Sequence, residues 1–216
     1  MANFFVRPDT SHNTTRNGLT YETAWGGIAE INFGTVGAGN TLYFCGTFDL
    51  TTVAVYLSPN GTLGNEVIIR GDYAGSPGVI NMSGTAYWNP TKSHVRYVNL
   101  TFNGKNIYFY NVNASTNVYD IKKSPTGYNI SFEGCTLNSC PISIEGASNG
   151  GTTLYGKLSF INNVITSPAS NGISWLCGSQ NKRDICIMEG ITISGNTISN
   201  CPNNGIQLRF QPAAQD

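Results

Sequence analysis

The chain has 216 residues, enough for one substantial core or at most two small ones. Only 11% of the residues are charged and the formal net charge is zero, so we exclude a protein that binds nucleic acid through a basic surface. The 25 glycines and 26 asparagines favour turns and strands over helices. These properties predict an all-β protein.

The first residues, MANFFVRPDT, lack the basic and apolar regions of a secretion signal. No apolar run approaches the roughly 18 residues that a membrane-spanning helix needs. We therefore expect no secretion signal and no membrane insertion. Further along, GTVGAGN at residues 34–40 precedes a strand pattern rather than a helix, so it predicts a loop and not a phosphate-binding turn.

A short phrase, apolar-x-apolar followed by Asn, Cys or Leu at a fixed offset, recurs along the rest of the chain. Its copies are LYFCGTF from Leu42, VIIRG from Val67, VRYVNLTF from Val95, ISFEGCTL from Ile130, LSFINNVI from Leu158 and ITISGNTI from Ile191. A second apolar alternation follows most copies, as in IYFY from Ile107, ISIEG from Ile142, ISWLCG from Ile173 and IQLRF from Ile206. No single unit can bury its own apolar row, so we expect the units to stack as a solenoid.

Two other all-β folds fit less well. A sandwich does not require one phrase to recur with the same residue types at the same offset. A propeller needs four strands and roughly 40–50 residues for each blade, more than these units offer. The pattern therefore favours a parallel β-helix.

The phrase resembles the coil repeat of right-handed parallel β-helices, as found in pectate-lyase-like proteins and bacteriophage tailspikes. In those folds an inward Asn or Cys at the turn after a strand stacks on its equivalent in the next coil. Cys135, Asn163 and Asn196 occupy that offset, and Leu100 occupies it in an earlier coil. The resemblance implies a right-handed β-helix of about five to six coils over residues 41–210, followed by a tail at residues 211–216.

The same resemblance implies an N-terminal entry segment over residues 1–40. In such proteins a short strand and an Asn/Gly loop lead into an amphipathic capping helix. The apolar face of this helix would comprise Thr23, Ala24, Trp25, Ile28, Ala29, Ile31 and Phe33. We expect the helix to cover the open end of the solenoid and to block edge pairing.

Residues between the apolar positions should point outward and form columns up the stack, because successive strand residues face opposite sides. The first strand gives one column of Arg96, Ser131, Ser159 and Thr192, and a second of Arg70, Tyr97 or Val98, Glu133, Ile161 and Ser194. The second strand gives the columns Tyr108, Ser143, Ser174, Gln207 and Tyr110, Glu145, Leu176, Arg209.

The catalytic candidates are Glu133, Glu145 and Arg209. Glycoside hydrolysis needs two carboxyl groups about 5–9.5 Å apart. Glu133 and Glu145 form such a pair only if both reach one groove, and are otherwise solvated outer-face residues. A lyase of the β-helix type usually needs a basic residue to accept a proton, which is the role predicted for Arg209. The chain lacks the clustered aspartates of calcium-dependent pectate lyases.

The carbohydrate-binding candidates are Tyr108, Tyr110 and Gln207. A tyrosine ring can pack against a pyranose, and Gln207 is an outward residue available for recognition. Trp175 occupies an inward position and is predicted to lie in the core, while isolated His94 is predicted to lie in a turn. The six cysteines show no C-x-x-C spacing and no nearby histidines, which predicts buried thiols and neither a metal nor a cofactor.

Three functions remain open. The first is a phage tailspike or tail-fibre protein of the virion that recognises, or also depolymerises, a surface polysaccharide. The second is an extracellular polysaccharide lyase or glycoside hydrolase, and the third is a structural β-helical module without catalysis. QPAAQD at the end of the sequence offers no helix to cover the last coil, so we expect a homotrimer or a further chain to cap it.

Overall fold

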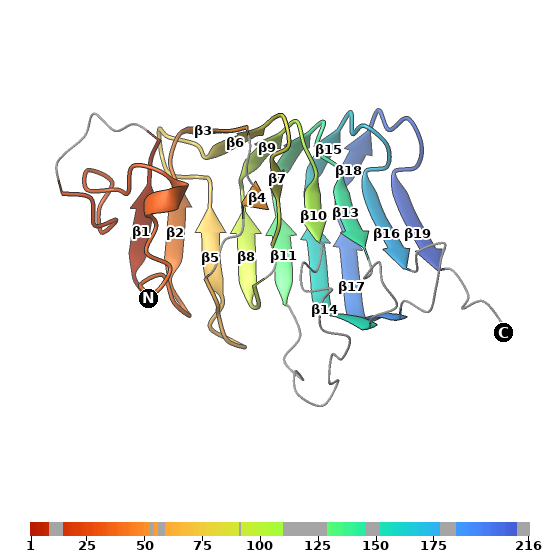
Figure 1. Ribbon diagram of the computed structural model, residues 1–216, viewed down its shortest axis with the longest axis horizontal. Coiled ribbons are helices and arrows are strands. Elements are labelled where there is room, and N and C mark those ends of the chain that lie inside the picture. The colour runs from red at the N-terminus through yellow and green to blue at the C-terminus, as the bar shows by residue number, and fades with distance from the viewer. Residues whose placement is uncertain are drawn as a thin grey trace.

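The computed structural model describes residues 1–8, 15–51, 54–55, 59–90, 92–109, 129–145, 152–177 and 185–210. Their strands form three parallel sheets that wind into a β-solenoid (Figure 1). The first sheet contains β1 (Asn3–Val6), β2 (Thr41–Phe44), β5 (Val67–Arg70), β8 (Val95–Val98), β11 (Ile130–Glu133), β14 (Thr152–Ile161) and β17 (Ile185–Ser194), in that order.

The other two sheets contain six strands each. The second sheet comprises β3 (Thr47–Leu50), β6 (Val79–Met82), β9 (Thr101–Asn103), β12 (Thr136–Asn138), β15 (Val164–Thr166) and β18 (Thr197–Ser199). The third comprises β4 (Ala54–Val55), β7 (Tyr87–Trp88), β10 (Ile107–Phe109), β13 (Ile142–Glu145), β16 (Ile173–Cys177) and β19 (Ile206–Phe210). Each strand pairs with the strand three places along the chain from β2 onward, so the chain visits the three sheets in turn.

Equivalent positions of successive copies of the repeated phrase lie opposite each other in the paired strands, as predicted. Val95 lies opposite Ile130, which in turn lies opposite Leu158. The alternative between Tyr97 and Val98 is also settled, because Val98 pairs with both Arg70 and Glu133 and therefore belongs to the outward column.

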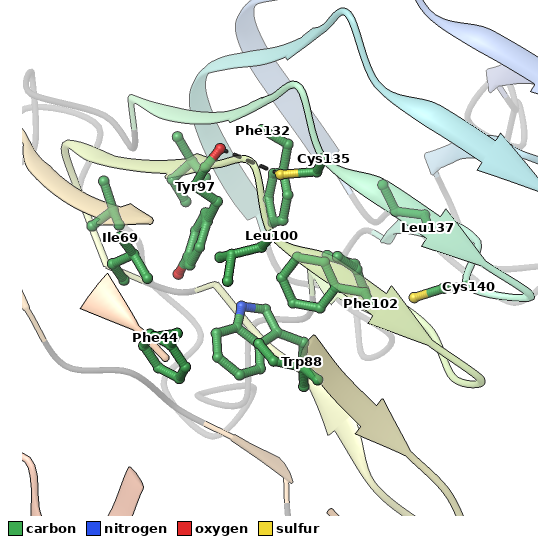
Figure 2. Close-up of a cluster of buried hydrophobic side chains, with 14 of the residues drawn as sticks. Phe44, Ile69, Trp88, Tyr97, Leu100, Phe102, Phe132, Cys135, Leu137 and Cys140 are labelled. Carbon is green, nitrogen blue, oxygen red and sulfur yellow. Dashed lines mark hydrogen bonds between the residues drawn. The ribbon is translucent and has the colours of Figure 1, made fainter. Parts of the chain in front are cut away.

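The core is a stack of aromatic and aliphatic side chains between the three sheets (Figure 2). Tyr97 and Phe132 stack with ring centroids 4.6 Å apart, and Phe160 follows Phe132 at 6.1 Å. Trp88 from the third sheet meets Tyr97 edge-on at 6.1 Å. Trp175 is also buried, which confirms its predicted place in the core.

The turns after β8, β11, β14 and β17 use a left-handed backbone. Asn99, Gly134, Asn162 and Gly195 occupy equivalent positions with φ between 53° and 66°. Only glycine, and to a lesser degree asparagine, adopts this conformation at low cost. This requirement explains why the repeated phrase carries Asn or Gly before its Leu, Cys or Asn.

An inner ladder of side-chain hydrogen bonds then fixes the turn. Asn163 is fully buried; its Oδ1 accepts from the Cys135 amide at 2.9 Å, and its Nδ2 donates to the Phe132 carbonyl at 2.9 Å. Asn196 repeats this one coil later, where its Oδ1 accepts from the Asn163 amide and its Nδ2 donates to the Phe160 carbonyl. The Cys135 thiol lies at the same offset and donates to the Tyr97 carbonyl (Figure 2).

A second, outer ladder runs along the second sheet. Asn81 donates to Asp49, Asn103 to Asn81, and Asn138 to Asn103, at 2.7, 2.7 and 2.9 Å. Thr166 Oγ1 donates to Asn138 Oδ1 at 2.8 Å. These outward side chains satisfy one another's hydrogen bonds at a surface where water can replace any of the partners.

The predicted capping helix is wrong as an amphipathic helix. Within the described residues the only helix is the 3-10 helix η1 (Ile28–Glu30). Trp25 instead forms a parallel bridge with Val6, in which its amide donates to the Phe5 carbonyl and its carbonyl accepts from the Arg7 amide. This extended backbone, followed by Gly26 and Gly27, is incompatible with a helix starting near Thr23. The segment nevertheless occupies part of the free edge of β1.

We predict that the inner ladder contributes far more stability than the outer one. Asn163→Ala leaves the Cys135 amide without its acceptor in the core and removes one hydrogen bond of the Phe132 carbonyl, which should lower the free energy of unfolding by about 2–4 kcal/mol. Asn138→Ala removes bonds that water replaces, and should cost about 1 kcal/mol or less. Urea unfolding of both variants measures the contrast, and equal losses would contradict it.

Candidate functional site

The outer face of the first sheet carries a group of aromatic rings and two arginine–carboxylate pairs. Its outward column reads Phe5, Tyr43, Arg70, Val98, Glu133, Ile161, Ser194. From β1 to β11 this column spans roughly 20 Å, at about 4.8 Å for each strand. Aromatic residues occupy its N-terminal end and arginine–carboxylate pairs follow them.

An aromatic cluster of four half-buried rings forms the first part of this face. It consists of Phe5, Tyr21, Tyr43 and Tyr73. Phe5 and Tyr43 stack at 5.3 Å, and Tyr73 meets both edge-on at 5.3 and 5.7 Å. Tyr21 stacks on Tyr73 at 4.9 Å, and the Arg7 guanidinium lies 4.2 Å above the Tyr21 ring. These mutual contacts hold the rings in place before any ligand arrives.

The first ion pair joins Arg70 and Asp72 beside Tyr43. Arg70 Nε and Nη2 donate to the two Asp72 oxygens at 2.8 and 2.5 Å. Asn99 Nδ2, from the left-handed turn after β8, donates to Asp72 Oδ2 at 2.7 Å. The pair is about one-third exposed, so it combines fixed geometry with access to solvent.

The second ion pair repeats this arrangement further along the same face. Arg96 Nε and Nη2 donate to the two Glu133 oxygens at 3.0 and 2.6 Å. Ser131 Oγ donates to Glu133 Oε1 at 2.7 Å. Each carboxylate therefore accepts two bonds from an arginine and one from a neutral side chain.

These contacts shift the pKa values of both carboxyl groups downward. Hydrogen bonds from Arg96 are the main cause of the lowered pKa of Glu133; burial opposes them and Ser131 adds to them. Hydrogen bonds from Arg70 likewise lower the pKa of Asp72. The same pairings raise the pKa of both arginines. At neutral pH the face therefore presents two locked ion pairs.

The structure places the predicted catalytic residues on two sheets. Glu133 ends β11 of the first sheet, where it pairs with Arg96, while Glu145 ends β13 of the third sheet. Leu176 pairs with both Glu145 and Arg209, so these two lie two strands apart as predicted. The side chains of Glu145 and Arg209 lie outside the described part of the structure, and the catalytic assignment stays a prediction.

The predicted carbohydrate-binding residues belong to the third sheet. Tyr108 pairs with Ser143 in the expected column, although its side chain is outside the description, and Tyr110 lies outside the described residues altogether. Gln207 is half-buried, and its Oε1 accepts a hydrogen bond from Asn171 Nδ2 at 2.9 Å. A binding role for these three residues stays a prediction.

The aromatic cluster was missed when the columns were traced from the sequence. Phe5 and Tyr43 extend the column that contains Arg70, and aligning FFV and LYF with the later strands would have revealed them. Tyr21 and Tyr73 come from loops, and no strand periodicity places loop residues. Their position depends on tertiary packing alone.

Three of the four cysteine thiols described as free are buried, and the fourth, Cys201, is half-buried. Cys45, Cys135 and Cys140 are free and buried, and burial raises the pKa of Cys45 and of Cys135 to about 12. Among the described residues no three His, Cys, Asp or Glu side chains gather as a metal site would require. His94 is buried with φ of 58°, in a turn as predicted, and its Nδ1 lies 3.2 Å from Asn129 Nδ2. No helix in this part of the chain is long and apolar enough to cross a bilayer.

No protein-family model, curated protein or solved structure matches the chain.

We predict that the Arg96–Glu133 pair gives a pH-dependent stability. Because the folded-state pKa of Glu133 is lowered, its contribution is complete above the unfolded pKa of about 4.3 and is lost as the pH falls through the lower folded value. The gap in free energy of unfolding between wild type and Glu133→Gln should be constant from pH 7 to about 5 and shrink below about pH 4.

The size of this gap is limited by solvent. The Arg96 side chain is 41% exposed, so the pair should contribute about 1 kcal/mol or less. Urea unfolding at pH steps from 7 to 3 measures it, and high salt should reduce the gap further. A gap that widens toward acidic pH would contradict the assignment.

Proposed function

We propose that the protein recognises a surface polysaccharide through the outer face of its first sheet. The observation that carries this proposal is the aromatic cluster beside the Arg70–Asp72 pair. Sugar rings offer apolar C–H faces and a rim of hydroxyl groups. Stacked tyrosines suit the faces, and charged hydrogen-bonding groups suit the rim.

The cluster is suited to binding because it is already ordered. Tyr73 contacts Phe5, Tyr43 and Tyr21, and each ring restricts the rotamers of its neighbours. A ligand that packs against ordered rings loses less of its binding free energy to side-chain ordering.

The described chemistry argues against Glu133 as the general acid of a glycosidase. The general acid of a glycosidase needs a raised pKa so that it holds a proton at working pH. Arg96 and Ser131 instead lower the pKa of Glu133 and keep it ionised. Because both Glu133 oxygens are also engaged by Arg96, we propose a binding role for Glu133 in place of a general-acid one.

We further propose that the protein is a right-handed β-helix of five to six coils and a homotrimeric tailspike or tail-fibre protein of a phage virion. The support is the resemblance of the coil phrase to tailspike repeats, which is an argument from fold. At β19 the inward side chains of Ile206 and Leu208 are both 46% exposed, whereas Ile173, the partner of Ile206 on β16, is fully buried. An apolar surface of this kind supports a partner that covers this end, either a further subunit or another chain.

Removing the aromatic cluster should weaken glycan binding by about tenfold for each ring, since aromatic side chains at the centre of binding surfaces often contribute more than 1 kcal/mol. The test is an array of bacterial capsular and cell-surface polysaccharides, probed with wild type, Tyr43→Ala and Tyr21→Ala. Tyr87→Ala is the matched control, because Tyr87 is a half-buried tyrosine on β7 of the third sheet.

Circular dichroism and thermal unfolding establish that each variant is folded. Binding that is lost equally in the control, or unchanged in both test variants, would remove the first sheet from the proposal. The same array, followed for new reducing ends and for absorbance from unsaturated products, reports any cleavage.

A further inference from the structure

We propose that this face selects uncharged sugar polymers over anionic ones such as uronic-acid chains. The inference rests on the proposed glycan-binding function and deepens it by naming the class of ligand. It is carried by the way the two arginines of the face are already occupied. Arginine is the usual partner of sugar carboxylates, so the state of these arginines decides the class of ligand.

Each guanidinium makes its bidentate contact with a carboxylate of the protein itself. Arg70 engages Asp72 and Arg96 engages Glu133, and each pair uses Nε and Nη2. A sugar carboxylate seeking the same two-point contact must first displace the internal one. The internal carboxylate is attached to the protein and so competes at a high effective concentration.

The local charge also disfavours an anion. The carboxylates that act on the two arginines are Asp72, Glu133 and Glu66, which raise the pKa of Arg70 or of Arg96. Each arginine thus has its charge balanced by the carboxylate that it contacts. At the aromatic end, the Arg7 guanidinium lies over the Tyr21 ring.

The remaining hydrogen-bonding capacity fits a hydroxyl group. A carboxylate has about four lone-pair sites, and in Asp72 and Glu133 three are already used. Toward the other described residues, Arg70 and Arg96 donate through Nε and Nη2 and not through Nη1. Each pair therefore offers donors beside one acceptor site. A sugar hydroxyl, which both donates and accepts, matches this combination, whereas a carboxylate matches only the donors.

The two pairs are also spaced along the stack. Arg70 lies on β5 and Glu133 on β11, two strand steps or about 10 Å apart. With the rings of Phe5 and Tyr43 on the preceding strands, the face offers apolar contact first and hydroxyl contacts further along. We infer that an extended neutral chain lies along the solenoid axis, over the rings and both pairs.

The experiment compares neutral polymers with derivatives of the same backbone that carry carboxylate groups. Dextran, galactomannan and hydroxyethyl cellulose, each with its carboxymethyl derivative, are immobilised and probed with the intact protein at low salt. We expect at least one neutral polymer to bind and its carboxymethyl derivative to bind about tenfold more weakly. Tighter binding to the carboxymethyl form would overturn the inference while leaving the proposed function intact. If none of the six polymers and no glycan of the polysaccharide array binds, the proposed function itself fails.

A charge variant tests the cause. Asp72→Asn removes the internal competitor and should strengthen binding to the carboxymethyl polymer about fivefold, in a manner that added salt suppresses. Asp49→Asn is the matched control, because it makes the same charge change on the second sheet, where Asp49 belongs to the outer ladder. An equal gain in both variants would assign the effect to net charge and overturn the role of the Arg70–Asp72 pair.

Discussion

The buried hydrogen bonds of Asn163 are the interaction on which the rest of the structure depends. They join the turn after one first-sheet strand to the coils on either side, through the Phe132 carbonyl and the Asn196 side chain. A stack of parallel strands can slip, and a slip of one residue exchanges inward and outward side chains. A fully buried amide tolerates no such slip, because its partners would be left unsatisfied in the core. The register is thereby fixed where the chain turns from the first sheet to the second.

Fixed register is what assembles the candidate site. Phe5 lies opposite Tyr43, and Tyr43 lies opposite Arg70, only because each strand repeats the alignment of the last. The Arg96–Glu133 pair then arises between neighbouring columns, since its members belong to different columns and different strands and lie 37 residues apart in the sequence. The Arg70–Asp72 pair is local, because its members are two residues apart in one coil. The next coil reaches this pair through Asn99, which donates to Asp72.

This origin explains what could be predicted from the sequence and what could not. Inward and outward positions follow from alternation, so the columns, the buried Trp175 and the Asn163 ladder were all predictable. The helix expected around Trp25 was not formed, because edge pairing with Val6 outweighed local amphipathic pattern. Tyr21 and Tyr73 reach the site from loops, where the alternation of inward and outward residues does not apply. The Arg96–Glu133 pair needed the register as well as the columns, since a one-residue shift would separate its members.

The two ladders show how such a fold separates stability from recognition. The hydrogen bonds of Asn163 in the inner ladder are buried, whereas the outer ladder from Asp49 to Thr166 lies at a surface where water competes. Outward columns can therefore change residue by residue while the inner phrase persists. On the first sheet the outward positions carry aromatic rings, followed along the stack by ion pairs. In each pair the arginine and the carboxylate neutralise each other's charge. A ligand therefore gains binding free energy from the unused donors and acceptor sites of the pairs, which suit a hydroxyl group, and not from net charge. Of the two pairs behind the selectivity proposed for this face, Arg96–Glu133 depends on the stacking that fixes the core, whereas Arg70–Asp72 forms within one coil and is joined to the next by Asn99.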